Sequence, residues 1–475
     1  MNRGVRRIFV LVIVLFLVLM GGTARWTVFE SDKLDKNDLN GRLALKTERV
    51  PRGTIRAADG TLLAKSVKQK DGTYVRHYTA AAKQASQLLG YAYTLAGLSG
   101  MEKVHNDDLT GKVKSAATLL SAIRGSNTKG DDVISTLEPK VQQAAITGLN
   151  GRVGAAVAID TKTGGILAMA SNPGFDPNDE ATRAGRKKIA AISGSPSINR
   201  ATAGQYPPGS TMKVVTTAAA LASGKYTPDS TVSGTSPLVV QTKPLSNFHG
   251  EQFPANITLT DALTNSVNTA FARVAEDLGA NPIADMMKNF GFNKALPVDA
   301  YGLASGVRDS KSHDLLPIKD DTVDIARVAI GQERLAVTPL QMAFVAATIA
   351  RGGDKPRLST VQRVVDPDGR TLSDLGNGHS AGRAVSQRVA SQLTAMMEQV
   401  VKEGTGTAAA LSGLRVAGKT GSAEVGGDLV DPWFIGFAPA EAPRVAVAVM
   451  MEKLPNATGG VDAAPIAKAM MEAAL

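Results

Sequence analysis

Apolar residues concentrate first near the N-terminus, where a run from Ile8 to Ala24 contains no charged residue. Three arginines precede it, namely Arg3, Arg6 and Arg7. A helix over this run spans roughly 25 Å at 1.5 Å per residue, close to the ~30 Å hydrocarbon core of a bilayer. Because a basic cluster stays on the cytoplasmic side, we expect residues 1–25 to be a single-pass membrane anchor with the rest of the chain extracytoplasmic. Cleavage as a signal peptide after residues 22–24 is the alternative.

A polar and irregular segment follows, from residue 26 to residue 132. Its Gly- and Asp-containing turns favour loops, and a disordered stalk is one interpretation of such a composition. Two stretches, Tyr91–Leu98 and Ala116–Ile123, are apolar enough to oppose that interpretation. We therefore expect a small folded module in residues 26–132.

Strand-like patterns occupy two regions that are far apart in the chain. The apolar stretches Gly154–Asp160 and Gly165–Ala170 flank the turn Thr161–Gly164 and predict a hairpin. Three further strands are predicted downstream, at Leu414–Val416, Trp433–Phe437 and Arg444–Met450. Because short links join these three, we expect an antiparallel meander.

A long, mostly helical segment, residues 180–400, separates the two strand regions. After the last strand, Asp462 is expected to cap a terminal helix that ends at Leu475. The pattern predicts an α+β domain over residues 133–475, in which a five-stranded antiparallel sheet carries a helical subdomain as an insertion.

Composition excludes several kinds of chemistry. The 475 residues include no cysteine, which rules out disulfides, thiolate-ligated metals and a thiol nucleophile. Five scattered histidines lack paired metal-ligand spacing, and no Gly-x-Ser-x-Gly sequence supports a Ser-His-Asp triad. We therefore expect no metal and no cofactor. The net charge of +10 comes without a nucleic-acid recognition motif, so affinity for anionic lipid or wall polymer is the favoured interpretation.

Three short motifs occur in an informative order. They are Ser210-Thr211-Met212-Lys213, Ser266-Val267-Asn268 and Lys419-Thr420-Gly421. S-x-x-K, S-x-N and K-T-G in this order describe an active-site serine acyltransferase of the penicillin-recognising type. A single copy carries little weight, because S-x-x-K recurs at Ser126 and S-x-N at Ser197. The order, the wide separation and the local setting of the three motifs carry the argument.

The setting of Ser210 favours it over Ser126. Ser126 lies in a polar, glycine-flanked stretch typical of a loop, whereas Ser210 follows the turn Tyr206–Gly209 and opens an apolar, helix-like run. Lys213 then lies one turn further on the same helix face. A serine hydroxyl needs a base within hydrogen-bond reach, and a desolvated lysine with a lowered pKa is such a base. The helix dipole at this end also favours a developing oxyanion.

The other two motifs supply substrate contacts in this interpretation. Ser266 and Asn268 lie in an expected loop between helices, where the hydroxyl can relay a proton and the amide can bind a substrate amide. Lys419 and Thr420 on a strand edge would meet a substrate carboxylate, and Gly421 would let the peptide lie close to the backbone.

A competing motif overlaps the third one, because Gly413–Thr420 satisfies the phosphate-binding pattern G-x-x-x-x-G-K-[ST]. That P-loop pattern requires a strand before the loop and a helix after it. Here a helix-like stretch, residues 408–411, precedes the motif, and a glycine-rich stretch, residues 421–427, follows it. The setting therefore disfavours a P-loop and a nucleotide-binding function.

With these motifs in place, the chain resembles the transpeptidase domain of penicillin-binding proteins. More narrowly it resembles the short, membrane-anchored class B type called penicillin-binding protein A in actinobacteria. Further segments that resemble family blocks are Asn199-Arg200, Tyr206–Gly209, Gly331-Gln332, Thr338–Ala343, Gly404–Ala408 and Trp433–Pro439. The resemblance implies an α/β/α penicillin-recognising serine transpeptidase fold, in which residues 26–132 form an extracytoplasmic pedestal.

The resemblance also implies a role for each matching residue. Ser210 is the acylated nucleophile, Lys213 its base, and Ser266 and Asn268 form the second catalytic element. Lys419 and Thr420 recognise the carboxylate beside Gly421. The backbone N–H groups of Ser210 and Ser422 form the oxyanion hole.

Two segments depart from the family pattern. In Arg52–Gly60, Ala57 and Ala58 replace an acid–base pair, which weakens the prediction of how the N-terminal region packs. Glu333 stands where many relatives have a glycine after Gly331-Gln332.

In the N-terminal region, Leu98–Glu102 resembles the motif of the family's pedestal module.

The leading function implied is D,D-transpeptidation, which cross-links the D-Ala-D-Ala stem peptides of peptidoglycan through an acyl-serine and is inhibited covalently by β-lactams. A D,D-carboxypeptidase would use the same residues with water as acceptor, and a β-lactam sensor or an idle scaffold would share the fold. A β-lactamase needs a deacylating Glu for which no matching loop is found. Because the chain leaves no room for glycan polymerisation, we expect a SEDS-type glycosyltransferase partner in the membrane.

Overall fold

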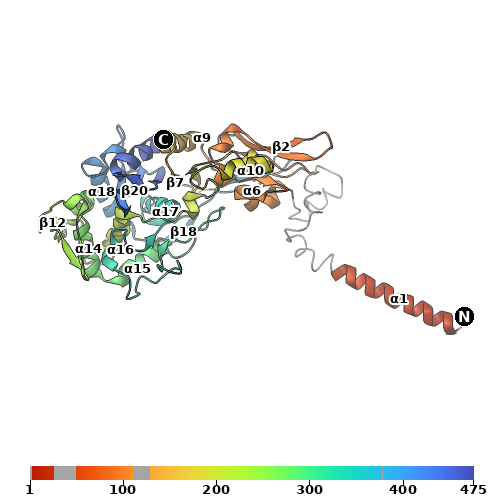
Figure 1. Ribbon diagram of the computed structural model, residues 1–475, viewed down its shortest axis with the longest axis horizontal. Coiled ribbons are helices and arrows are strands. Elements are labelled where there is room, and N and C mark those ends of the chain that lie inside the picture. Colours follow the sequence, from red (N-terminus) through yellow and green to blue (C-terminus); the bar gives the residue numbers. More distant parts are fainter. Residues whose placement is uncertain (1–2, 26–49, 112–128, 377) are drawn as a thin grey trace. The chain divides into compact units, whose positions relative to one another are not determined.

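The computed structural model describes residues 3–25, 50–111, 129–376 and 378–475 (Figure 1). The chain divides into two units. The smaller unit comprises Met1–Pro51 and Val67–Val75. It contains helix α1 (Arg3–Ala24), whose side chains from Phe9 to Met20 are exposed. Within the described part of the chain, no helix is both long enough and apolar enough to cross a membrane. The apolar stretch Ala116–Ile123 and the second S-x-x-K serine, Ser126, lie outside the described residues.

Two six-stranded sheets are present, and most of their residues belong to the larger unit, which comprises Arg52–Ser66 and Arg76–Leu475. The first sheet has the order β17-β16-β6-β1-β2-β3, and its β1 and β6 are parallel. Its strands are β1 (Ile55–Arg56), β2 (Leu62–Lys68), β3 (Tyr74–Tyr78), β6 (Asp132–Ser135), β16 (Val361–Val365) and β17 (Thr371–Asp374). Strands β16 and β17 come from the segment predicted to be a helical insertion, and β16 pairs with β6. This sheet therefore draws strands from both sides of the predicted boundary at residue 132.

Short elements complete the N-terminal module. They are α4 (Ala80–Lys83), α5 (Ser86–Leu89), β4 (Ala92–Tyr93), β5 (Gly97–Leu98), α6 (Gly100–Val104) and α7 (Asn106–Leu109). The stretch Tyr91–Leu98 forms the β4–β5 hairpin. Ala57 is fully buried, and its N–H donates to the carbonyl of Thr61, so the alanine fits the turn that begins this module.

The central sheet confirms the predicted five-stranded antiparallel arrangement, with the order β19-β20-β21-β7-β8. Its strands are β7 (Gly154–Asp160), β8 (Ile166–Asn172), β19 (Ala417–Gly426), β20 (Leu429–Ala438) and β21 (Val445–Met451). A two-residue strand, β22 (Leu454–Pro455), pairs with the first two residues of β20. The predicted hairpin of β7 and β8 is confirmed, and one register shift lies beside its turn.

The predicted strand at Leu414–Val416 is wrong. Leu411 and Leu414 instead form an isolated bridge that reverses the chain, with Gly413 in the left-handed region at φ 74°. The strand begins at Ala417 and extends through the K-T-G motif to Gly426. Backbone pairing with the long strand β20 sets the limits of β19. The alternation of apolar and polar residues near the motif does not reveal this pairing.

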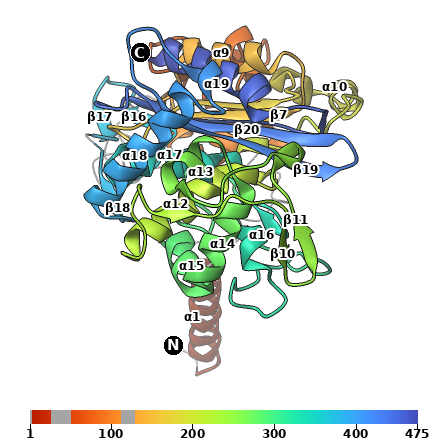
Figure 2. The same cartoon turned by 90° about the vertical axis from the view of Figure 1, so that its left-hand side faces the viewer.

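Helices cover both faces of the central sheet, which gives the α/β/α layers expected (Figure 2). On one face α9 (Pro139–Leu149) and α19 (Ala464–Ala474) pack on each other and on the sheet. On the other face α17 (Pro339–Ala350) packs on β7 and β21. Because both faces are covered, successive residues of β7 are buried in opposite cores and the strand reads as continuously apolar.

Asp462 does not cap the terminal helix as expected. A π-helical turn, Gly459–Ala463, precedes α19, and the Thr458 hydroxyl accepts from the N–H of Val461. The Asp462 carboxylate in turn accepts from the N–H of Thr458 at 2.9 Å. Each side chain thus satisfies one backbone donor of this turn, and the capping residue is Thr458, four residues earlier than predicted.

The helical subdomain lies between the two strand regions in sequence. Its helices are α10 (Arg183–Ala190), α11 (Arg200–Ala203), α12 (Lys213–Ala222), α13 (Leu259–Thr264), α14 (Asn268–Leu278), α15 (Ala280–Asn289), α16 (Ile325–Ala329) and α18 (Gln387–Lys402). Short strand pairs interrupt it, at β9 (Thr231–Val232) with β12 (Ile257–Thr258), β10 (Leu238–Val240) with β11 (Lys243–Leu245), β13 (Gly306–Val307) with β14 (Leu335–Ala336), and β15 (Asp354–Pro356) with β18 (Ser380–Arg383).

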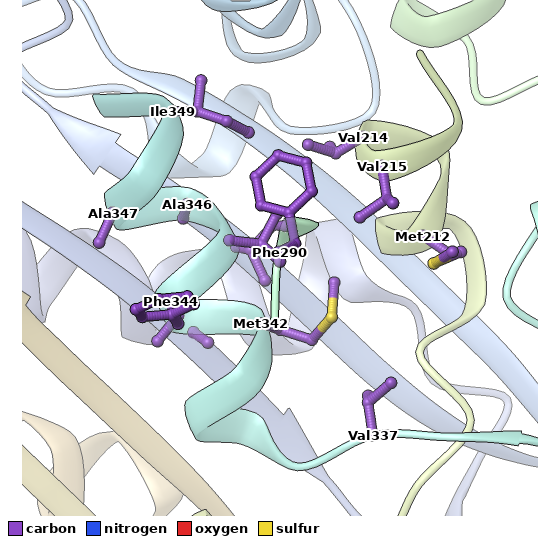
Figure 3. Close-up of a cluster of buried hydrophobic side chains, with 14 of the residues drawn as sticks. Met212, Val214, Val215, Phe290, Val337, Met342, Phe344, Ala346, Ala347 and Ile349 are labelled. Atoms are coloured by element: carbon purple, nitrogen blue, oxygen red, sulfur yellow. The ribbon is translucent and has the colours of Figure 1, made fainter. Parts of the chain in front are cut away.

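A buried apolar cluster joins this subdomain to the central helix α17 (Figure 3). Met212, Val214 and Val215, which follow Ser210, lie in one cluster with Met342 and Ile349 of α17. Each of these side chains is at most 1% exposed. The segment that carries the first motif is therefore anchored in the apolar core through the residues that follow Ser210.

Candidate active site

Ser210 lies in a 3₁₀ turn, Gly209–Met212, that leads directly into α12. The predicted helix start is thus correct, but its first turn is tighter than an α-helix because both the N–H and the hydroxyl of Thr211 donate to the carbonyl of Pro208. The turn is held from outside by Gly331, whose carbonyl accepts from Gly209 at 3.0 Å. A Cβ at Gly331 would lie 1.9 Å from the Gly209 carbonyl oxygen, so only glycine fits there.

Lys213 is fully buried one turn after Ser210, and its ammonium group points at the second motif. Its Nζ donates to the Ser266 carbonyl at 2.6 Å and to Asn268 Oδ1 at 2.7 Å, and it lies 3.3 Å from Ser266 Oγ. Burial, with the nearby charge of Lys419, holds the pKa of Lys213 well below its ordinary value. Among the described residues no carboxylate pairs with Lys213, so no opposite charge opposes this shift of the pKa toward the neutral amine.

The contacts of Lys213 are compatible with that neutral form. Two of its partners, the Ser266 carbonyl and the Asn268 amide oxygen, can only accept, and a neutral amine still has two protons for them. The third neighbour, the Ser266 hydroxyl, can donate to the nitrogen lone pair. A neutral Lys213 would therefore leave none of these groups without a hydrogen-bond partner.

The second motif is a tight link between α13 and α14. Ser266 has φ 59°, which is costly for a residue with a Cβ, and this backbone places its carbonyl against Lys213. Val267 is fully buried and its N–H donates to the carbonyl of Ala262. The predicted loop between helices is confirmed, and α14 begins at Asn268, the last residue of the motif.

Asn247 is a positioning residue that the sequence did not reveal. It is 3% exposed, and its Oδ1 accepts from the N–H of Thr269 at 3.0 Å. Its Nδ2 donates to the carbonyls of Gly234 and Glu251 at 3.1 Å. The neighbouring Ser246 carbonyl accepts from Asn268 Nδ2 at 3.0 Å. This segment thus fixes both the start of α14 and the amide of the second motif.

The third motif lies inside strand β19, with Lys419 fully buried. Burial lowers the pKa of Lys419 to about 7. Its Nζ donates to the Thr420 carbonyl at 3.1 Å and approaches Thr420 Oγ1 at 3.5 Å. Gly421 is required by close packing, because a Cβ there would lie 2.8 Å from the carbonyl oxygen of Pro208 beside the Ser210 turn.

Thr405 is a second residue missed by the sequence analysis. Its hydroxyl lies 2.6 Å from that of Thr420, and its N–H donates to the carbonyl of Thr264. The preceding Gly404 makes this approach possible, since a Cβ there would lie 2.4 Å from the same carbonyl. Thr405 therefore orients the hydroxyl of the third motif. Its signals in the sequence are its position between two glycines and its place in Gly404–Ala408, which resembles a family block, but neither assigned it this role.

One cleft of about 1260 Å³ brings the three motifs together. The motif residues that line it are Ser210, Ser266, Asn268, Thr420, Gly421 and Ser422. Lys213 and Lys419 are buried behind its wall. Ser197, in the second S-x-N sequence, is not among the lining residues. Within the described ranges, no group of three or more histidine, aspartate or glutamate side chains is placed to hold a metal ion.

The structure also decides between the two motifs that share Lys419. A P-loop places its lysine and threonine at the start of a helix. Here Lys419 and Thr420 pair with Ile435 and Phe434 on the edge strand of an antiparallel sheet, and strand β20 rather than a helix follows. The phosphate-binding interpretation of Gly413–Thr420 is therefore excluded.

An α/β/α fold with a helix-borne S-x-x-K, an interhelical S-x-N and a strand-borne K-T-G around one cleft defines the penicillin-recognising serine enzymes. The family model "Penicillin binding protein transpeptidase domain" matches residues 154–472, and "Penicillin binding protein A dimerisation domain" matches residues 52–133. The chain therefore belongs to the penicillin-binding protein transpeptidase family.

Individual relatives agree with this assignment over the full chain. The peptidoglycan D,D-transpeptidase PbpA of Mycobacterium tuberculosis is 35% identical over 100% of this chain and 99% of its own length. PbpA of Mycolicibacterium smegmatis is 36% identical with the same coverage. Among solved structures, the ceftriaxone acyl-enzyme complex of penicillin-binding protein A from M. tuberculosis superposes with a TM-score of 0.83 at 34% identity, covering 91% of this chain and 100% of that one.

Proposed function

We propose that this chain is a peptidoglycan D,D-transpeptidase that works through an acyl-Ser210 intermediate and is acylated by β-lactams. The observation that carries the proposal is the buried Lys213, unpaired with any described carboxylate, one turn after Ser210 in a cleft shared by all three motifs. The relatives named as D,D-transpeptidases and the solved acyl-enzyme complex support the same chemistry.

Acylation begins when Ser210 Oγ attacks the carbonyl carbon between the two D-Ala residues and its proton passes to neutral Lys213. The tetrahedral oxyanion is stabilised by the backbone N–H groups of Ser210 and Ser422. When the C–N bond breaks, the departing D-Ala nitrogen takes a proton through the Ser266 hydroxyl, which lies 3.3 Å from Lys213 Nζ. The free D-Ala then leaves, and the rest of the stem peptide remains as an ester of Ser210.

Deacylation reverses these roles. The amine of a second stem peptide attacks the ester carbonyl, loses its proton to the same base, and forms the cross-linking amide as Ser210 regains its hydrogen. Lys419 and Thr420 hold the C-terminal carboxylate of the donor before acylation, and Asn268 binds an amide of the peptide chain. Water in place of the amine would give carboxypeptidase activity on the same residues.

The location of the chain is part of the proposal. Residues 1–25 anchor it in the cytoplasmic membrane with the cleft outside, because the apolar run and the arginines before it favour that orientation. A membrane-embedded SEDS-type glycosyltransferase supplies the glycan strands. Protease treatment of intact cells tests the orientation: digestion of the catalytic domain from outside is expected, and its protection would contradict it.

Penicillin labelling tests the nucleophile. The full chain treated with penicillin is expected to gain one adduct, and peptide mass spectrometry should place it on Ser210. Ser210→Ala should abolish the adduct, whereas Ser197→Ala, which alters the second S-x-N sequence, should retain it. An adduct on Ser126, or none on the folded chain, would contradict the assignment.

A further inference from the structure

Strand β19 continues past the K-T-G motif and carries one more charged group into the cleft. Thr420, Ser422 and Glu424 alternate along the strand and therefore share one face, and all three line the cleft. Ala423, between the last two, faces the other way and is fully buried. The pairing of β19 with β20 is regular through Glu424 and shifts only beyond it, so the alternation holds at this residue.

The Glu424 carboxylate has no partner among the residues that the structure describes. Its side chain is exposed, and no hydrogen bond or ion pair reaches the carboxylate from any residue that the structure describes. By contrast Glu333, another carboxylate that lines the cleft, pairs with Arg334 at 3.1 Å. One strand thus brings two recognition points to the cleft: Thr420, with Lys419 buried behind it, and the Glu424 carboxylate four residues further on, about 13 Å away at 3.3 Å per residue.

The distance from Thr420 to Glu424 can be compared with the length of a bound stem peptide. This comparison rests on the transpeptidase function proposed above. With its terminal carboxylate at Thr420 and its scissile carbonyl at the N–H of Ser422, the donor peptide runs along β19 as an added strand. A peptide strand advances by the same ~3.3 Å per residue. The residue that precedes D-Ala-D-Ala therefore lies between Ser422 and Glu424, within reach of the Glu424 side chain.

The chemistry of cross-linking says what that residue carries. Acyl transfer between stem peptides consumes a D-Ala-D-Ala end on one peptide and an amine on another. When the polymer is cross-linked among its own subunits, every stem peptide must carry both, so the donor also has a side-chain ammonium upstream of its D-Ala pair. We infer that Glu424 binds this ammonium and is a specificity-determining residue for donors with a diamino acid before D-Ala-D-Ala.

Three synthetic pentapeptides test the inference. They end in D-Ala-D-Ala and differ only at the preceding residue, which is lysine, Nε-acetyl-lysine or alanine. The rate of D-Ala release is measured with the unchanged chain, with Glu424→Gln, and with Glu251→Gln, a control that removes another exposed cleft carboxylate outside β19. The unchanged chain and the control should prefer the lysine peptide by about 10-fold in kcat/KM.

Glu424→Gln should lose that preference by slowing on the lysine peptide alone, and Glu424→Asp should restore part of it. Persistence of the preference in Glu424→Gln would overturn the inference. An equal loss in Glu251→Gln would overturn it as well, because the effect would then belong to the total charge of the cleft.

Failure of the proposed function would look different. In that case the unchanged chain would release no D-Ala from any of the three peptides and would not be acylated by penicillin. That result would overturn the transpeptidase proposal and, with it, this role of Glu424. Acylation of the unchanged chain together with D-Ala release at equal rates from all three peptides would overturn the Glu424 inference and leave the transpeptidase proposal in place.

Discussion

Two buried charged clusters in this protein are built in opposite ways. In the N-terminal module Glu102, fully buried, is held by Arg76 at 2.5 Å and by Arg52 at 2.9 Å, and Tyr78 donates to it at 3.1 Å. In the cleft Lys213 and Lys419 are equally buried, and in the described chain neither pairs with a carboxylate. Burial is the same in both clusters, whereas the pairing of charges differs.

The pKa values follow this difference. Burial alone would raise the pKa of Glu102, but Arg76 and Arg52 hold it below its ordinary value, so the charge stays fixed. Burial lowers the pKa of both lysines, and nothing opposes it. A paired buried charge serves structure, since breaking it leaves an uncompensated ion. An unpaired buried lysine serves chemistry, because it can be neutral near neutral pH and act as a base.

The largest expected effect is on folding, from Glu102→Gln. The change leaves two buried guanidinium groups without their counter-charge and should lower the free energy of unfolding by about 3–5 kcal/mol. Urea unfolding of the full chain measures it. Because the folded pKa of Glu102 is depressed, its contribution is present above the unfolded pKa and is lost as the pH falls through the folded one.

A matched surface change sharpens this result. Lys83 pairs with Asp176 at 2.6 Å but is 52% exposed, so Lys83→Gln should cost less than about 1 kcal/mol. If the two variants lose equal stability, burial does not make the Glu102 cluster more important for folding than an exposed ion pair.

Lys213→Ala should change catalysis and leave folding largely intact. Removing a general base typically costs ~10²-fold or more, so the rate of penicillin acylation should fall at least that far. Stopped-flow measurement with a fluorescent penicillin checks it. Lys225→Ala, at an exposed lysine shortly after the same helix, should have little effect. Survival of acylation within a few fold in Lys213→Ala would show that another group is the base.

Lys419→Ala should weaken recognition of carboxylates. The loss expected is about 1.5–3 kcal/mol in the acylation rate constant for β-lactams that carry a carboxylate, as for hydrogen bonds to charged groups. An ester analogue without that carboxylate should be much less sensitive to the change. Equal sensitivity of the acid and the ester would refute this role for Lys419.

The pKa of Lys419, about 7 in the free protein, predicts a descending pH limb. Only the protonated ammonium attracts a carboxylate, so kcat/KM for acylation should fall by up to ~10-fold for each pH unit above the pKa. Lys213 has the opposite effect on the pH profile. Its pKa is lowered, and as the pH rises a larger fraction of Lys213 is neutral and able to act as the base, so the acylation rate rises. Replacing the acid with the ester analogue should abolish the descending limb, and a limb that persists would assign it to another group.

Thr405→Val should have the smallest effect. It removes the hydroxyl 2.6 Å from Thr420 Oγ1 and should cost about 0.5–1.5 kcal/mol, which is a few-fold to about 10-fold in acylation rate. Thr407→Val, at another threonine that lines the cleft, is the control and should change the rate less. No difference between the two variants would remove Thr405 from the carboxylate-binding group.

Features encoded by near neighbours were predictable from the sequence. The β7–β8 hairpin follows from two apolar stretches around a four-residue turn, and the helix after Ser210 follows from its turn and apolar run. The limits of β19 and the position of β16 were not predictable, because pairing with β20 and β6 sets them. The same holds for the contact of Asn247 with Thr269, which joins residues 22 positions apart.

By itself, the sequence determined which chemical groups this protein has and in what order: a serine with a lysine one turn later, a serine and an amide before a helix, and a lysine–threonine pair before a glycine. Only the tertiary structure decided that both lysines are buried with no carboxylate partner among the described residues, that the Thr405 hydroxyl contacts that of Thr420, and that Glu424 lines the cleft. The reason is physical. A residue type sets the ordinary pKa and hydrogen-bonding capacity of a side chain, but its working pKa and its partners depend on burial and on charges brought by distant segments.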